Sequence, residues 1–179
     1  SESIHSIMCK SLEDKDINND ESIKALKQVL FGEKLSYEFK NIEENKLGKT
    51  KGQLVGGNLT LIHCLIGSKS SINTDNKILF IEDLGEYLYH IDRMLVSLKR
   101  AGYFDKCKGL IVGDFSDLRK NTTPFGKNLK QIILDAVKDF DFPVLFEFPA
   151  GHEKLNMPLI LGREIIMDIK SSTSSIEFL

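Results

Sequence analysis

The sequence of 179 residues predicts an α/β domain built on a mixed sheet with flanking helices. Uninterrupted apolar runs bounded by polar residues recur in the middle of the chain, which is typical of strands covered on both faces. Segments with apolar residues at helical spacing lie between these runs. Closely spaced strand-like segments end the chain and predict a hairpin or meander there.

Composition indicates an ordinary globular domain and excludes several classes of protein. Hydrophobic residues make up 41% of the chain and charged residues 28%. The formal net charge is −2, with both signs interspersed, so the basic footprint of a nucleic-acid-binding protein is absent. No apolar stretch approaches the roughly 20 residues that span a bilayer. Three cysteines without metal-ligand spacing, Cys9, Cys64 and Cys107, predict reduced thiols, a cytoplasmic location and no zinc site.

Residues 1–34 predict a connecting arm that leads into a helix. The chain begins without an initiator Met, a basic n-region or an apolar h-region, so we expect a processed or truncated polypeptide. Polar residues dominate from Glu13 to Asp20 and predict a linker, with Asn19 or Asp20 as the helix N-cap. The apolar residues that follow at helical spacing are Ile23, Leu26, Val29 and Leu30.

Alternating or apolar segments predict the strands, and a polar loop is expected over the charged run Glu43–Lys51. Gly56-Gly57-Asn58 should interrupt the second strand and turn into a helix that Asn58 caps and that ends near Gly67. The predicted strands are 35–39, 53–55, 77–81, 109–113, 143–146, 159–162, 164–169 and 174–179. Further helices are predicted over 86–101, where Gly102 ends the helix, and around 129–137.

Two polar positions after predicted strands are the first candidates for a site. Ligands of open α/β sheets bind at the carboxyl ends of strands. Glu82 and Asp83 follow the strand 77–81, and His152 follows the segment Phe146–Gly151. A carboxylate beside an imidazole can hold the ring in one tautomer and stabilise the imidazolium during proton transfer.

The same residues also have plainer interpretations. Glu82 could cap the next helix or pair with a lysine, Asp83 could cap the helix that begins near Glu86, and His152 could fill a polar loop. Pro149-Ala150-Gly151 before His152 favours a tight loop with room for a substrate. The other histidines, His5, His63 and His90, match no arrangement of ligands or bases and are expected to be structural or solvent-facing.

Five motifs in order resemble the LD-carboxypeptidase family, which includes the microcin C immunity peptidases. They cover the chain from about Gly52 to Gly162 and are specific jointly rather than singly. The motifs are Gly56-Gly57-Asn58-Leu59, Ile78 to Asp83, Ile91-Asp92-Arg93, Gly109 to Gly113, and Phe148-Pro149-Ala150-Gly151-His152.

The resemblance implies a swivelling β/β/α-type domain over 35–179, preceded by an N-terminal domain to which 1–34 would connect. It implies catalytic roles for Glu82 and His152, with a serine on a Gly-Tyr-Ser-Asp type turn of that N-terminal domain. No serine in this chain matches the turn, so we expect the 179 residues alone to be inactive. Relatives often carry His-Gly-Pro-Met where this chain has His5-Ser6-Ile7-Met8, so the resemblance assigns no substrate role to His5.

For the intact protein, the resemblance implies a serine-type carboxypeptidase that acts in cell-wall recycling in the cytoplasm. It would hydrolyse the amide bond between an L-centre and a terminal D-amino acid, such as the D-alanine of a murein tetrapeptide. Neither a metal nor an organic cofactor is implied. The expected partners are a muropeptide or related peptide substrate, the protein's own N-terminal domain and a second copy in a homodimer.

Two other functions stay open at this point. A non-catalytic swivelling domain could carry a phosphoryl group on His152, and that role would need no carboxylate at Glu82. A degenerate relative could bind muropeptides without cleaving them. The motifs also leave open whether the substrate is a murein tetrapeptide or a peptide-nucleotide antibiotic.

Overall fold

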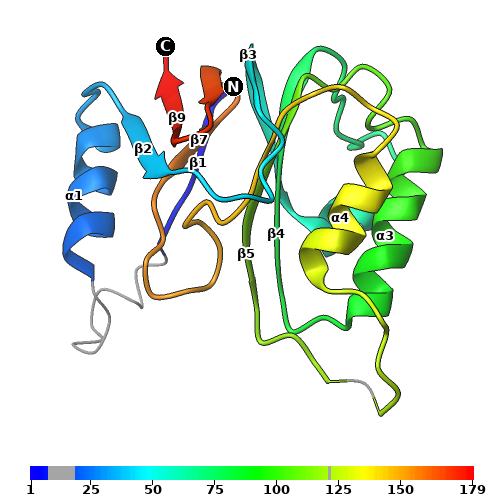
Figure 1. Ribbon diagram of the computed structural model, residues 1–179. Helices are drawn as coiled ribbons and strands as arrows, with labels where there is room; N and C mark the ends of the chain where they lie inside the picture. Colours follow the sequence, from blue (N-terminus) through cyan, green and yellow to red (C-terminus); the bar gives the residue numbers. More distant parts are fainter. Residues whose placement is uncertain (8–18, 121) are drawn as a thin grey trace.

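The computed structural model describes residues 1–7, 19–120 and 122–179, with side chains from Glu21 onward in the first helix (Figure 1). Cys9 and most of the expected linker, together with the capping side chains of Asn19 and Asp20, lie outside the described residues. In chain order the elements are β1 (Ser3–His5), α1 (Asn19–Leu30), β2 (Ser36–Lys40), β3 (Gly48–Asn58), α2 (Leu59–Cys64), β4 (Lys77–Leu84), α3 (Leu88–Arg100), β5 (Gly109–Ser116), α4 (Leu129–Val137), β6 (Val144–Leu145), β7 (Leu159–Leu161), β8 (Glu164–Ile169) and β9 (Thr173–Phe178).

The described elements confirm the predicted α/β class and the mixed sheet. Seven strands pair in the order β2-β9-β8-β3-β4-β5-β6. The half from β3 to β6 is parallel, whereas β8 and β9 pair antiparallel to their neighbours. Helices α3 and α4 cover one face of the parallel half, and α1 lies on the other side of the molecule beyond β2 and β9 (Figure 1). In the described residues, no helix is both long and apolar enough to span a bilayer.

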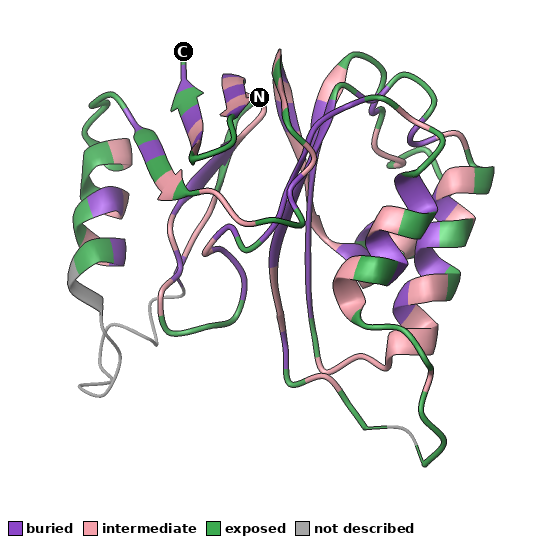
Figure 2. Cartoon of the chain, in the orientation of Figure 1, coloured by how far each residue is buried: buried purple, intermediate pink, exposed green. Residues whose placement is uncertain are grey.

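Two hydrophobic clusters flank the central strands. The first cluster joins α2, α3 and α4 to Leu79 and Ile81 of β4. The second joins Ile78 and Phe80 of β4 to β2, β8, β9 and α1. Figure 2 shows the resulting burial of β4, β5 and the inward faces of α3 and α4. Because successive side chains of a strand point to opposite faces, β4, β5 and β6 each contribute to both clusters, whereas β3 contributes Leu54 to the second. The predicted apolar face of α3 is confirmed, with Ile91, Leu95 and Leu98 fully buried.

Strand β3 is longer than the sequence predicts and corrects two expectations. The charged run was expected to form a loop, but Gly48–Gln53 pairs with β8. Gly56 and Gly57 do not interrupt the strand, because they pair with Phe80 and Ile81 of β4. A Cβ atom on Gly56 would lie 1.9 Å from the carbonyl oxygen of Phe80, so the glycine permits close pairing here rather than a turn. Asn58 does cap α2, as predicted, by accepting from the backbone N–H of Leu61.

The two ends of the chain also differ from the prediction. β8 and β9 form the expected hairpin, but β7 pairs instead with β1, a strand that the sequence pattern does not reveal. In α1, the buried side chains are Ser22 and Ala25, whereas Leu30, placed on the apolar face, is 64% exposed. The small side chain of Ser22 allows α1 to approach the loop at Asn156 closely.

Candidate active site

Glu82 and His152, 70 residues apart in the chain, are in direct contact. Nδ1 of the His152 imidazole lies 2.9 Å from Oε2 of the Glu82 carboxylate. Glu82 is 2% exposed, whereas the His152 side chain is 43% exposed. Among the described residues, Glu82 neither caps a helix nor pairs with a lysine, and it contacts His152 instead. Within the described residues, Nε2 of His152 forms no hydrogen bond and remains free to meet a reactant.

Glu82 and Asp83 are successive residues of β4, so their side chains point to opposite faces of the sheet. The register with β5 shifts between Ile81 and Asp83, and Glu82 continues on the side of Phe80. Asp83 turns toward α2, where one carboxylate oxygen accepts from the N–H and the hydroxyl of Thr60 at 3.0 and 2.8 Å. The other oxygen accepts from the side chain of Asn58 and from the N–H of Leu84. Asp83 therefore secures the start of α2, not the start of α3 as one interpretation had it.

The loop that carries His152 is fitted closely against β5. The N–H of Asp114 donates to the carbonyl oxygen of Ala150 at 2.8 Å. A Cβ atom on Gly113 would lie 2.2 Å from that same oxygen, so only glycine permits the approach. These contacts fix the position of the loop against β5, and they thereby place His152 beside Glu82.

A buried amide side chain closes the same loop. Nδ2 of Asn156 donates to the carbonyl oxygen of Gly151 at 2.6 Å, and Oδ1 accepts from the N–H of Gly151 at 3.4 Å. The N–H of Asn156 donates to the hydroxyl of Ser22, a fully buried residue of α1. These contacts hold the residue before His152 and link the loop to the first helix.

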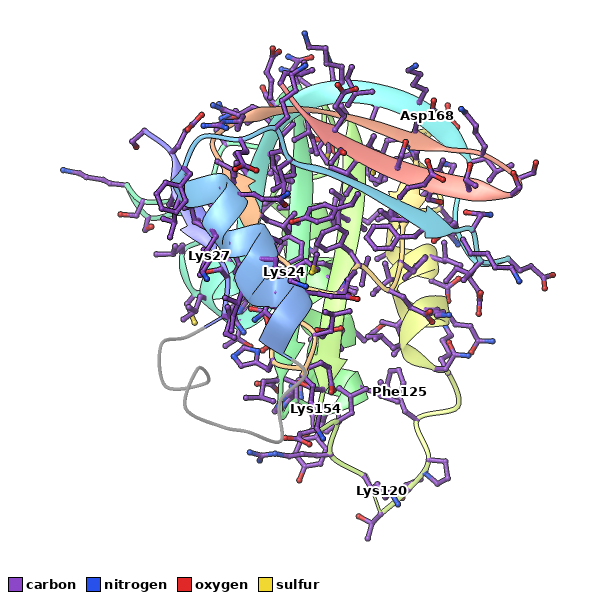
Figure 3. All side chains as sticks on the ribbon, turned by 90° about the vertical axis from the view of Figure 1, so that its left-hand side faces the viewer. Lys24, Lys27, Lys120, Phe125, Lys154 and Asp168 are labelled. Carbon is purple, nitrogen blue, oxygen red and sulfur yellow. The ribbon has the colours of Figure 1, made fainter. Side chains whose placement is uncertain are left out.

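The position of α1 relative to this loop is visible from the side of the helix. In Figure 3, Lys24 and Lys27 mark α1, and Lys154, two residues after His152, lies below it. Farther along the loop, the hydroxyl of Tyr37 on β2 donates to the carbonyl oxygen of Pro158 at 2.7 Å. The loop is therefore anchored at its beginning by β5 and at its end by α1 and β2.

Asp114 adds another carboxyl group near His152. Burial raises the pKa of Asp114 to about 6, repulsion from Glu153 and Glu82 adds to the rise, and the nearby His152 opposes it. Its Oδ2 atom is buried and has no hydrogen-bond partner among the described residues. The ionisation of Asp114 is therefore linked to the charges of Glu153, Glu82 and His152.

Sequence reasoning missed three residues of this site. Asp114 follows an apolar strand, so the same rule that selected Glu82 could have found it. Nε2 of His5, expected to be structural or solvent-facing, lies 3.9 Å from Oε1 of Glu82. Asn156 gave no signal, because an asparagine in a polar loop is ordinary.

The remaining histidines lie elsewhere, on α2 and α3. Nδ1 of His90 lies 2.9 Å from a carboxylate oxygen of Glu86. His63, Glu86 and His90 together line a surface hollow of about 390 Å³. No group of three or more His, Cys, Asp or Glu side chains in the described part of the chain is arranged to hold a metal ion. Of the described cysteines, Cys64 and Cys107 are free.

A buried carboxylate that holds one nitrogen of a partly exposed imidazole is typical of proton-transfer sites in hydrolases. The matching family model is the LD-carboxypeptidase C-terminal domain, over residues 51–167. Because this match covers more than half of the sequence, the chain belongs to the LD-carboxypeptidase family, as the motifs predicted.

Several known proteins are similar to the chain. The probable murein peptide carboxypeptidase of Bacillus subtilis (strain 168) is 35% identical over 130 residues, which are 73% of this chain and 41% of that protein. The microcin C7 self-immunity protein MccF of Escherichia coli is 29% identical over 135 residues, or 72% of this chain and 37% of that protein. The chain thus spans less than half the length of these relatives.

Among solved structures, the muramoyltetrapeptide carboxypeptidase from Oxalobacter formigenes superposes with a TM-score of 0.90 at 23% identity. The superposition covers 99% of this chain and 61% of that one. At this level of identity, the likeness establishes a shared fold, and it extends through α1 and β1 as well as the region matched by the family model.

Replacing Asn156 with alanine should destabilise the domain by about 2 kcal/mol, because two backbone groups of Gly151 lose their partners in a buried setting. Urea unfolding monitored by circular dichroism measures this loss. Asn156→Asp, which places a buried carboxylate beside the carbonyl oxygen of Gly151, should be at least as unstable at neutral pH as Asn156→Ala. Equal stability of all three proteins would contradict the assigned role.

Replacing Asp114 with asparagine should make the domain more stable above pH 6. An unfolded aspartate has a pKa near 3.9, so the folded state, with its pKa of about 6, binds the proton more tightly. Wild-type stability should therefore fall as pH rises from about 4 to about 6. Because the carboxyl is half-buried, solvent screening reduces the gain in Asp114→Asn to about 1 kcal/mol.

Thermal unfolding of both proteins across this pH range measures the difference. The exposed Asp141→Asn is the matched control and should leave the pH profile unchanged. A gain in Asp114→Asn that is the same at pH 4 and pH 7 would argue against ionisation as its cause.

Proposed function

We propose that this chain supplies the glutamate and the histidine of a Ser-His-Glu triad in a serine-type LD-carboxypeptidase. The observation that carries the proposal is the 2.9 Å contact between Nδ1 of His152 and the buried carboxylate of Glu82, in a chain of this family. The serine would come from a Gly-x-Ser-Asp-like turn of an N-terminal domain, which the greater length of the relatives supports.

In the proposed mechanism, Nε2 of His152 takes the proton of the serine hydroxyl and later donates it to the leaving amine. Glu82 accepts the Nδ1–H of His152 and so keeps Nε2 unprotonated and directed at the nucleophile. The buried carboxylate also stabilises the imidazolium, because a charge pair is stronger where water is excluded. In this proposal the chain provides the general base, His152, and the carboxylate that orients it, Glu82.

The substrate is proposed from the family and the names of relatives. The bond cleaved would join an L-centre to a terminal D-amino acid, as in the D-alanine of a murein tetrapeptide. Relatives named murein peptide carboxypeptidase and murein tetrapeptide carboxypeptidase support this choice. We further propose that the protein acts in the cytoplasm in cell-wall recycling, as a homodimer and without a metal or organic cofactor.

Replacing either triad residue should abolish most activity when the chain is joined to the serine-bearing domain. Glu82→Gln should lower kcat by roughly 10⁴-fold, because the imidazole loses its orienting charge. His152→Ala should lower it by roughly 10⁴-fold or more, because the base is lost. Release of D-alanine from a murein tetrapeptide measures both effects.

The exposed Glu177→Gln is the control for these replacements and should retain full activity. Unchanged circular dichroism spectra would show that the fold is intact in each variant. Wild-type rates in Glu82→Gln and His152→Ala would remove both residues from the mechanism.

The purified 179-residue chain should fold but release no D-alanine, because in the described residues no serine hydroxyl contacts His152. The same assay measures this, with the chain joined to the serine-bearing domain as the positive control. Turnover by the 179 residues alone would refute the split of the triad. Muropeptide binding without turnover by the joined protein would instead favour the non-catalytic alternative.

A further inference from the structure

A second imidazole, that of His5, lies near the carboxylate of Glu82. Nε2 of His5 lies 3.9 Å from Oε1 of Glu82, and Nδ1 of His152 lies 2.9 Å from Oε2. Each carboxylate oxygen therefore faces a different histidine. Among the described residues, Oε1 has no other hydrogen bond or ion pair.

The pairing of β1 with β7 brings His5 close to the loop that carries His152. His5 lies opposite Leu159, the first residue of β7. The loop that carries His152 ends directly before Leu159. A single antiparallel pair thus sets the distance between the strand that holds His5 and the loop that holds His152.

Contacts with β4 fix the His5 ring. It packs edge-on against Phe80 with ring centroids 5.1 Å apart, and Phe80 precedes Glu82 by two residues on the same side of the strand. The His5 side chain is 20% exposed, and its Nδ1 atom is buried without a partner among the described residues. Of the two neutral tautomers, the one protonated at Nε2 turns a donor toward Glu82 and leaves no N–H buried without an acceptor.

A carboxylate that is held through one oxygen can still rotate, because the terminal torsion of glutamate has a broad energy minimum. A donor at the second oxygen would fix the plane of the carboxylate and hence the direction of its bond to His152. The present 3.9 Å separation exceeds a normal hydrogen bond. Hydrogen bonds in catalytic sites are often long before substrate binds and shorten in the complex.

We propose that His5 is a positioning residue that holds the second oxygen of Glu82 and thereby fixes the tautomer and orientation of His152. The consequence for catalysis rests on the proposed function, whereas the contact itself does not. The contrasting interpretation gives His5 only a packing role against Phe80. That role would be met equally well by an apolar ring.

The ¹⁵N chemical shifts of the histidine side chains test the contact in the 179-residue chain. At about pH 8, above the ordinary range of histidine titration, the neutral tautomers of His152 can be distinguished. We expect the Nδ1–H form to dominate in wild type, and the ratio of Nδ1–H to Nε2–H to fall at least twofold in His5→Phe. His5→Gln, which keeps a donor, should restore most of the ratio.

His63→Phe, a ring replacement on α2 away from Glu82, is the control and should leave the His152 signals unchanged. An unaltered ratio in His5→Phe would overturn the proposal, because packing alone would then explain His5. If His5→Phe does not fold, His5→Met provides the same comparison of an apolar side chain with glutamine.

Activity of the chain joined to the serine-bearing domain tests the consequence separately. His5→Phe should lower kcat by roughly 10-fold to 100-fold with little change in KM, the size of effect expected for a small misplacement of a catalytic group, and His5→Gln should recover most of it. A tautomer change in a protein without peptidase activity would support His5 as the partner of Glu82 while refuting the proposed function. Full activity in His5→Phe would overturn the positioning role even if the hydrolase function stands.

Discussion

The burial of the Glu82 carboxylate is the constraint around which the rest of the site is arranged. A carboxylate with 2% exposure is costly unless its oxygens find partners, since few water molecules reach it. β4 contributes only apolar neighbours on that side, so the partners come from other segments. His152 arrives on the loop before β7, and His5 arrives on β1. Each of these segments is held in turn by its own hydrogen bonds.

The end of β4 serves two separate purposes on its two sides. Asp83 accepts from Asn58, Thr60 and Leu84, so it has no free capacity for chemistry. These bonds tie β4 to the start of α2. Glu82, on the opposite side, is therefore carried by a backbone that is restrained from both neighbouring strands, and a rigid support is what a positioned acid–base pair requires.

Residues 1–7 and 19–34 contact the rest of the described chain. Ser22 accepts from the backbone of Asn156, and Arg163 donates to the carboxylate of Glu2. β1 also forms the only ladder to β7 within the described residues. That this segment follows another domain stays a prediction, but its contacts contribute directly to the loop of His152. The boundary at residue 34 stays a prediction from the sequence pattern.

Local pattern determined the α/β class, the apolar strands 77–81 and 109–113, the helices around Ile91 and Ile132, and the two candidates at strand ends. These features depend on neighbours along the chain, so periodicity and polar boundaries reveal them. Tertiary structure alone decided that Gly56 stays in a strand, that β7 pairs with β1, and that Asn156 and His5 belong to the site. Each of these depends on groups more than 20 residues apart or on a close backbone approach, which no local pattern encodes. For the same reason the sequence could nominate Glu82 and His152, but only the folded chain could bring them within hydrogen-bonding distance.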